Sequence, residues 1–176
     1  FLKIKTLVKR VNKNEKIIKI LDLGGGIGIN YKNEKVIHFN DYAKIISNLS
    51  NDLGCKLILE PGRMLVGESG ILITKVLYTK KNKKNTFIVV DAGMNDLMRP
   101  ALYDSLHPVV EITPKGKTAP VKKYDVVGPV CESADVFGLN IPLSEELTHN
   151  DLVAFTGAGA YGATMSSYYN ARKLPA

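Results

Sequence analysis

Three consecutive glycines follow a short apolar segment in LDLGGGIGINY, at Gly24, Gly25 and Gly26. Glycines directly after a strand let the backbone approach an anion closely and present its N–H groups, which a phosphate-binding loop requires. The spacing does not match the dinucleotide fingerprint, because Ile29 stands where the third glycine would be, and no Walker-type Gly-Lys-Ser/Thr follows. By itself the segment is equally compatible with phosphate binding and with a tight strand-to-helix turn.

A second apolar segment ends in a polar turn, where LILEPGRMLVG places Glu60, Gly62 and Arg63. In a TIM barrel, polar residues at the C-terminal ends of strands lie at the open face where catalysis takes place. Glu60 and Arg63 suit that face. A Pro-Gly turn with a surface ion pair is the alternative and is favoured when the segment is taken alone. Because two loops suited to anions follow successive strands, the interpretation as the open face of a barrel is favoured over a simple surface turn.

Alternating helices and strands would position these two loops. Helices over residues 1–12 and near 41–53 alternate with strands at 19–23 and 56–59, and such doubly apolar strands are typical of βα units. After a boundary near residues 66–69, short β-rich segments separated by turns predict a different architecture. These segments are a hairpin formed by residues 70–80 and 86–93 around KNKKN, and strands within 107–113, 123–128 and 151–157.

The expected fold is therefore α/β followed by β. Residues 1–67 are expected to form the C-terminal part of a TIM-type (β/α) barrel, and residues 68–176 a mostly antiparallel β-barrel or sandwich domain.

Composition argues against several classes of partner. The 24 Lys and Arg residues exceed the 17 Asp and Glu, but the lysines are dispersed and lack interleaved aromatic residues, so we expect a solvated surface and no nucleic acid. No apolar run reaches the roughly 18 residues of a membrane span, so no membrane partner is expected. Cys55 and Cys131 are far apart and fit a reducing cytoplasm. The three histidines are also dispersed, and no metal site is expected.

Three later segments carry a resemblance: VVDAGMNDLMRPALYDSLHPV, GPVCESADVFG and GAGAYGATMSSYYNARKLPA. Together with the two loops, in the same order and spacing from about Leu21 onward, they resemble the fold-type III pyridoxal-phosphate decarboxylases of the alanine-racemase-like barrel family. Within that family the chain is most similar to the enzymes that act on diaminopimelate. The resemblance implies pyridoxal 5'-phosphate as cofactor and conversion of meso-2,6-diaminopimelate to L-lysine and carbon dioxide. It also implies a homodimer with active sites at the subunit interface.

The resemblance assigns the cofactor-binding residues. Gly24 to Gly26, with the turn that contains Gly62, correspond to the loop that holds the cofactor phosphate. Glu60 corresponds to the acid that faces the pyridine nitrogen, where a carboxylate keeps the ring protonated and able to accept electrons. Arg63 and Arg99 correspond to the family's arginines that face the substrate carboxylate and the phosphate, for which planar guanidinium groups are suited.

It also assigns residues that contact the substrate. Tyr103 resembles a substrate-contacting tyrosine, and Tyr161 resembles one that lies close to the cofactor and substrate. Cys131 and Glu132 match a pair contributed across the dimer interface, with Glu132 recognising the distal amino group and Cys131 near the reacting carbon. Protonation of that carbon by Cys131 is a hypothesis. Taken singly, a buried structural cysteine and packing roles for the tyrosines are the more common interpretations, and only the joint occurrence favours a site.

In this family a Schiff-base lysine, a ring-stacking histidine and about the first half of the barrel precede the glycine loop. No lysine here stands in a matching context, so these 176 residues alone are expected to be inactive. The alternatives are another fold-type III decarboxylase, acting on ornithine, arginine or carboxynorspermidine, and a non-catalytic homologue that regulates a true enzyme. A nicotinamide-binding domain is disfavoured because the glycine spacing fails.

Overall fold

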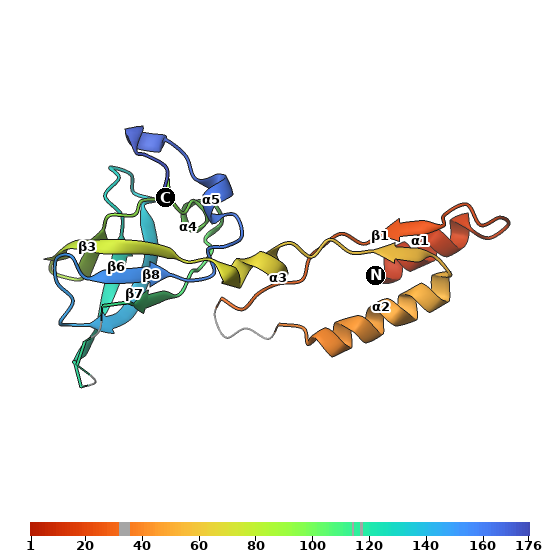
Figure 1. The fold of residues 1–176 in the computed structure, drawn as a ribbon, viewed down its shortest axis with the longest axis horizontal. Helices are drawn as coiled ribbons and strands as arrows, with labels where there is room; N and C mark the ends of the chain where they lie inside the picture. Colours follow the sequence, from red (N-terminus) through yellow and green to blue (C-terminus); the bar gives the residue numbers. More distant parts are fainter. Residues whose placement is uncertain (32–35, 114, 117) are drawn as a thin grey trace. The chain divides into compact units, whose positions relative to one another are not determined.

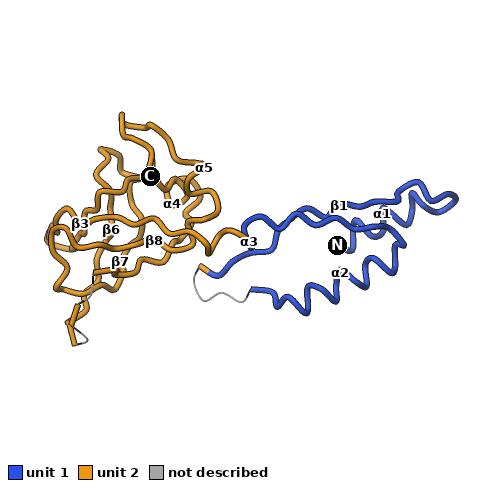
Figure 2. Tube along the Cα trace, viewed as in Figure 1, with its two compact units in different colours: residues 1–30, 34–64 blue, residues 31–33, 65–176 orange. Residues whose placement is uncertain are grey.

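The chain forms two compact units in the computed structural model, which describes residues 1–31, 36–113, 115–116 and 118–176 (Figure 1). Unit 1 consists of residues 1–30 and 34–64, and unit 2 of residues 31–33 and 65–176 (Figure 2). None of the helices in the described part of the chain combines the length and apolarity that a membrane crossing requires.

Unit 1 contains two parallel strands and two helices. Its elements are α1 (Leu2–Val11), β1 (Ile20–Asp22), α2 (Phe39–Leu53) and β2 (Lys56–Ile58), and α3 (Arg63–Val66) follows β2 across the division between the units. The strands pair in parallel with Ile20 opposite Lys56. The helices bury Val8 and Leu49 and are joined by the Lys5–Asp52 ion pair. Helix α2 ends at Gly54, whose φ of 59° is the left-handed conformation that terminates many helices.

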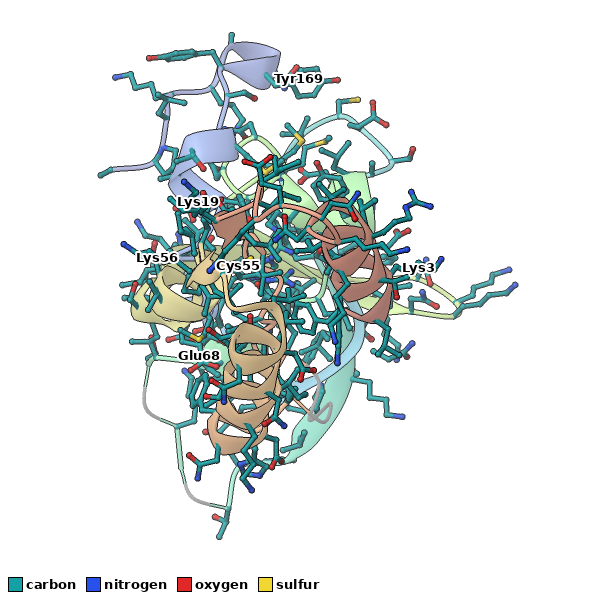
Figure 3. All side chains as sticks on the ribbon, turned by 90° about the vertical axis from the view of Figure 1, so that its right-hand side faces the viewer. Lys3, Lys19, Cys55, Lys56, Glu68 and Tyr169 are labelled. Atoms are coloured by element: carbon teal, nitrogen blue, oxygen red, sulfur yellow. The ribbon has the colours of Figure 1, made fainter. Side chains whose placement is uncertain are left out.

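The two strands of unit 1 begin side by side. The backbone N–H of Lys56 donates to the carbonyl of Lys19 at 2.9 Å. Figure 3 shows the side chains of Lys19, Cys55 and Lys56 gathered at this end of the strands. The Cys55 thiol is buried and lies 3.1 Å from the carbonyl oxygen of Ile18.

Unit 2 is a single curled sheet with the strand order β5-β8-β3-β4-β6-β7. The strands are β3 (Leu72–Lys81), β4 (Thr86–Val90), β5 (Val109–Glu111), β6 (Val121–Val127), β7 (Val136–Ser144) and β8 (Leu152–Phe155). The edge strands β5 and β7 approach one another, and the backbone N–H of Ser144 donates to the Glu111 carboxylate at 2.6 Å. The sheet is therefore a nearly closed barrel, which leaves little free edge.

The core of unit 2 lies inside this curled sheet. Phe137 and Phe155 pack with ring centroids 4.3 Å apart, next to the fully buried Ile88 and Val126. Short helices and 3₁₀ turns lie in the connections: the turn Gly67–Ser69, α4 (Arg99–Tyr103), α5 (Gly162–Met165) and the turn Tyr169–Ala171. Two of these connections carry residues expected in the site.

The β domain expected from the sequence is confirmed in outline, and its sheet is mostly antiparallel, as expected. The hairpin formed by β3 and β4 is antiparallel, as predicted, and so are three further pairs. The pair β4–β6 is parallel, so the sheet is mixed. The reason is the long connection over residues 91–120, because a parallel pair needs a crossover where an antiparallel pair needs only a turn.

Strand β7 was not predicted from the sequence. It contains Gly138, Asn140 and Pro142, which usually mark turns. The strand tolerates them because it is an edge strand, where proline leaves no ladder hydrogen bond unmade on its outer side. In unit 1 the described residues form the expected alternation of strand and helix but close no barrel.

Candidate functional site

In unit 1 the glycine loop (residues 24–28) is docked on the EPGR turn (residues 60–63). The N–H of Glu60 donates to the carbonyl of Gly24 at 2.8 Å, and the N–H of Gly24 donates to the Asp22 carboxylate at 2.7 Å. At Gly25 a Cβ would lie only 2.5 Å from the carbonyl oxygen of Glu60. Because both segments follow the carboxyl ends of adjacent parallel strands, the two loops identified separately in the sequence form one structure.

The glycine loop offers open backbone to an anion. Gly24 and Gly26 have φ values of +66° and +92°, the left-handed region that side chains rarely adopt, and no described heavy atom lies within 4 Å of a Cβ built on either. Nη2 of Arg63 would lie 3.8 Å from a Cβ at Gly28. The loop and the guanidinium together fit a phosphate, which is bound by backbone N–H groups and a cation.

Two carboxyl groups lie together where β1 and β2 end. The hydrogen bond to Asp22 and the charge of Asp22 raise the pKa of the exposed Glu60 carboxyl, with a smaller contribution from desolvation. Like charges held this close favour a cationic ligand, since a positive group between them relieves their repulsion. Asp22 was not among the residues predicted from the sequence. Its position as the last residue of a strand next to the glycine loop was the available signal.

In unit 2 a buried arginine lies among aromatic rings, in what we call the Arg99 cluster (Arg99, Tyr31, His107 and Tyr161). The Arg99 side chain is 6% exposed, and Nη1 donates to the Tyr31 hydroxyl at 2.8 Å. The guanidinium lies 5.3 Å from the ring centroid of Tyr31 and 5.5 Å from that of Tyr161. Among the described residues no carboxylate forms an ion pair with Arg99, so within that part of the chain the buried cation has no counter-charge.

The structure therefore brings Arg99 and Tyr161 together, as a shared site requires. Tyr161 has a φ of +68°, an unfavourable conformation for a non-glycine residue, and its ring is half-exposed. Tyr103, at the end of α4, and Cys131 and Glu132, in the loop between β6 and β7, are exposed. Within the part of the chain that is described, no hydrogen bond, ion pair or ring contact joins these three to Arg99 or Tyr161.

A buried aspartate organises the loop that carries Cys131 and Glu132. The Asp135 carboxylate accepts the N–H of Val130 and the N–H of Met94, both at 2.7 Å. Burial raises the pKa of Asp135, and these two hydrogen bonds oppose the effect. Asp135 thus ties the loop between β6 and β7 to the segment after β4. Sequence reasoning missed it, although an acidic residue between the CES motif and an apolar strand was a visible signal.

Arg172 fastens the C-terminal segment to the same region. Its Nε donates to the Asn95 side-chain oxygen at 2.8 Å, and its Nη2 lies 3.4 Å from the Asp96 carboxylate. The Asp96 carboxylate also accepts the N–H of Gly93 at 2.7 Å. Asn95 and Asp96 are buried, so the segment after β4 is held by polar contacts on both sides. Both cysteines are free, and the described residues contain no group of three or more acidic, His or Cys side chains that could hold a metal ion.

A curled mixed sheet with a polar segment after β4 and a Cys-Glu loop before β7 defines a known class of domain. The family model described as "Pyridoxal-dependent decarboxylase, C-terminal sheet domain" matches residues 11–159. The chain belongs to this family of pyridoxal-dependent decarboxylases, which confirms the resemblance given by its motifs.

The individual relatives are more specific. The chain is similar to diaminopimelate decarboxylase from Helicobacter pylori, with 48% identity over 155 residues that cover 88% of this chain and 38% of that protein. Diaminopimelate decarboxylase from Zymomonas mobilis is 40% identical over 176 residues, which cover 99% of this chain and 41% of the relative. The crystal structure of the Helicobacter pylori enzyme complexed with L-lysine matches with a TM-score of 0.88 and 45% identity, covering 98% of this chain and 42% of that one. The chain spans about two fifths of the length of these relatives.

Proposed function

We propose that this chain is the C-terminal part of a pyridoxal-phosphate-dependent decarboxylase that converts meso-2,6-diaminopimelate to L-lysine and carbon dioxide. The observation that carries the proposal is the docking of the glycine loop on the EPGR turn, where the N–H of Glu60 and the carbonyl of Gly24 are 2.8 Å apart. Open glycine backbone, a guanidinium and a pair of carboxylates then share one small region. The identity of 40–48% to diaminopimelate decarboxylases supports the choice of substrate.

The residues of unit 1 fit the cofactor by their chemistry. The backbone of Gly24 to Gly26 and of Gly62, with the Arg63 guanidinium, would hold the phosphate. Glu60, supported by Asp22, would face the ring nitrogen and keep it protonated. When bound, pyridoxal phosphate supplies a conjugated cationic ring that accepts the electron pair left as carbon dioxide departs.

The residues of unit 2 would bind and orient the amino acid. Arg99 offers a guanidinium, already desolvated, to a substrate carboxylate, and Tyr161 limits its position from one side. Tyr103 and Glu132 would read the distal end of the substrate, and the Cys131 thiol would carry a proton to the reacting carbon. An analogue that lacks the distal amino group would leave the polar groups of this site without hydrogen-bond partners. Such analogues are therefore expected to be rejected strongly.

The proposal includes the organisation of the complete enzyme. Residues 1–67 would complete a (β/α) barrel begun by a preceding segment that carries the Schiff-base lysine, and residues 68–176 would be its β domain. The active enzyme would be a homodimer in the cytoplasm, with each site at the subunit interface and with Cys131 and Glu132 supplied by the partner subunit.

The test compares substrates on the complete enzyme, which is this chain joined to its N-terminal barrel segment. Release of carbon dioxide is measured with diaminopimelate, ornithine, arginine and carboxynorspermidine, and diaminopimelate is expected to be preferred. Glu60→Gln should lower kcat by about 100-fold or more, because the neutral amide no longer stabilises the protonated ring. Glu68→Gln, an exposed substitution, is the matched control. Preference for another substrate, full activity of the Glu60→Gln enzyme, or lysine production by the 176-residue chain alone would each contradict the proposal.

A further inference from the structure

His107 is one of the most deeply buried polar residues of unit 2, and the proposed reaction assigns it no role. Its side chain is 3% exposed, just before β5. Nδ1 lies 3.0 Å from the carbonyl oxygen of Thr156, and Nε2 lies 3.3 Å from Nη1 of Arg99. The ring of Tyr31 packs edge-on against the imidazole, with centroids 5.3 Å apart.

These contacts determine which nitrogen of His107 carries the proton. A carbonyl oxygen can only accept, so Nδ1 must be protonated and donate to Thr156. A guanidinium can only donate, so Nε2 must present its lone pair to Arg99. A second proton would place two cations 3.3 Å apart in a buried site. Burial is the main cause that lowers the pKa of His107, and the charge of Arg99 acts in the same direction, while the bond to Thr156 opposes them. The imidazole is therefore neutral and held as one tautomer.

The imidazole in turn determines which donors of Arg99 remain available. Nη1 has two hydrogens, and its two recorded partners are the Tyr31 hydroxyl and Nε2 of His107. Among the described residues no hydrogen-bond partner is recorded for Nε or Nη2 of Arg99. These two groups form one edge of the guanidinium, and such an edge can bind a carboxylate through two parallel bonds.

We infer that His107 is a positioning residue: as a neutral imidazole it occupies one hydrogen of Arg99 Nη1, fixes the guanidinium and leaves its Nε–Nη2 edge for the carboxylate of the amino-acid substrate. The inference rests on the proposed function for the identity of that carboxylate. It goes beyond that function because it gives His107 a role that is exerted through Arg99.

The kinetic test uses the complete enzyme with two substitutions at one position. His107→Leu removes the acceptor, and the KM for diaminopimelate should rise about tenfold to hundredfold, while cofactor affinity changes less than about twofold. His107→Gln can donate to Thr156 through its amide nitrogen and accept from Arg99 through its oxygen, so it should retain most of the affinity. His149→Leu, at an exposed histidine that also contacts a backbone carbonyl, is the matched control. Loss of cofactor affinity in His107→Leu would show that Arg99 serves the phosphate, and an unchanged KM would show that His107 positions nothing; either result overturns the inference.

A second measurement does not depend on turnover. In enzyme labelled with ¹⁵N-histidine, the His107 signals are assigned by their loss in His107→Gln. They should show one protonated and one unprotonated nitrogen at about pH 6.5 and above, where an ordinary histidine is still partly protonated. The ionisable groups recorded against the ring are Arg99 and Tyr31. An imidazolium or an Nε2-protonated tautomer overturns the inference. If the enzyme shows the expected tautomer of His107 but does not decarboxylate diaminopimelate, the proposed function is refuted while the positioning of Arg99 by His107 is supported.

Discussion

Replacing Gly25 by alanine tests most directly whether the glycine loop and the EPGR turn bind the cofactor as one structure. The added methyl group would lie 2.5 Å from the carbonyl oxygen of Glu60 and 3.9 Å from Cα of Pro61, and a separation of at least 3.0 Å is needed. The backbone of the EPGR turn must therefore move by roughly 0.5 Å or more, which disturbs its hydrogen bond to Gly24. Overpacking of this kind costs about 1–3 kcal/mol. If the loop and the turn bind the cofactor as one structure, that cost weakens binding by about 5-fold to about 150-fold.

The assay is a titration of the complete apoenzyme with pyridoxal phosphate, followed by fluorescence. Gly116→Ala is the control outside both loops, because its methyl group would meet no described heavy atom within 4 Å. We expect the Gly116→Ala enzyme to bind the cofactor within about twofold of the unsubstituted enzyme. Equal affinities for the two variants would refute the reasoning, since steric contact at Gly25 is the only difference invoked.

Three further perturbations act in unit 2. In Asp135→Asn, the side-chain amide nitrogen replaces one of the two carboxylate oxygens that accept the N–H groups of Val130 and Met94. One of these two N–H groups therefore loses its hydrogen-bond acceptor, at a cost of about 1–3 kcal/mol, and its hydrogen exchange should accelerate. Arg172→Met should release the C-terminal segment from the loop after β4, which limited proteolysis would detect as faster cleavage. Burial and Arg99 hold the pKa of His107 in the folded protein below its ordinary value of 6.5. The neutral imidazole therefore contributes stability that is present above about pH 6.5 and is lost as the pH falls through the folded-state pKa. The free energy of unfolding should fall by up to about 1.4 kcal/mol per pH unit in this range. Urea unfolding of the His107→Gln variant should lack that slope.

Controls for these perturbations lie nearby on the surface. Ser133→Ala and Lys173→Met alter exposed neighbours in sequence and should leave exchange and proteolysis unchanged. Accelerated exchange in Ser133→Ala would indicate general loosening of the loop. Identical pH slopes for the unsubstituted protein and the His107→Gln variant would show that His107 does not titrate differently in the folded and unfolded chains.

The elements that could be predicted from the sequence are those whose local pattern agrees with their final environment. The hairpin of β3 and β4 alternates apolar residues on either side of a polar turn, and it forms as expected. Strand β7 could not be predicted in this way, because Gly138 and Pro142 are residue types typical of turns. They are tolerated in this strand because it lies at the edge of the sheet. The parallel pairing of β4 with β6 also has no local signal, since it depends on how a long connection folds back.

The candidate site divides in a similar way. Motifs identify residues whose chemistry is unusual, such as the glycine loop and Arg99. The residues that hold them in place have ordinary types: Asp22 ends a short strand, Asp135 precedes another, and His107 stands alone in the sequence. Their roles depend on partners distant in the chain, such as the carbonyl of Thr156, and these become visible only in three dimensions. The resemblance supplied the family but did not supply these supports.

The parallel pair β4–β6 has a consequence for how the molecule assembles in time. Phe87 meets Asp125 only after the whole connection between the two strands has been made, and that connection carries both Arg99 and His107. Contacts between distant parts of a chain form slowly, because the entropy of closing a long loop is lost before the contacts compensate it. Partners of these two side chains, the Thr156 carbonyl and the Tyr161 ring, come later still in the chain, so we expect the guanidinium and the imidazole to become buried late in folding.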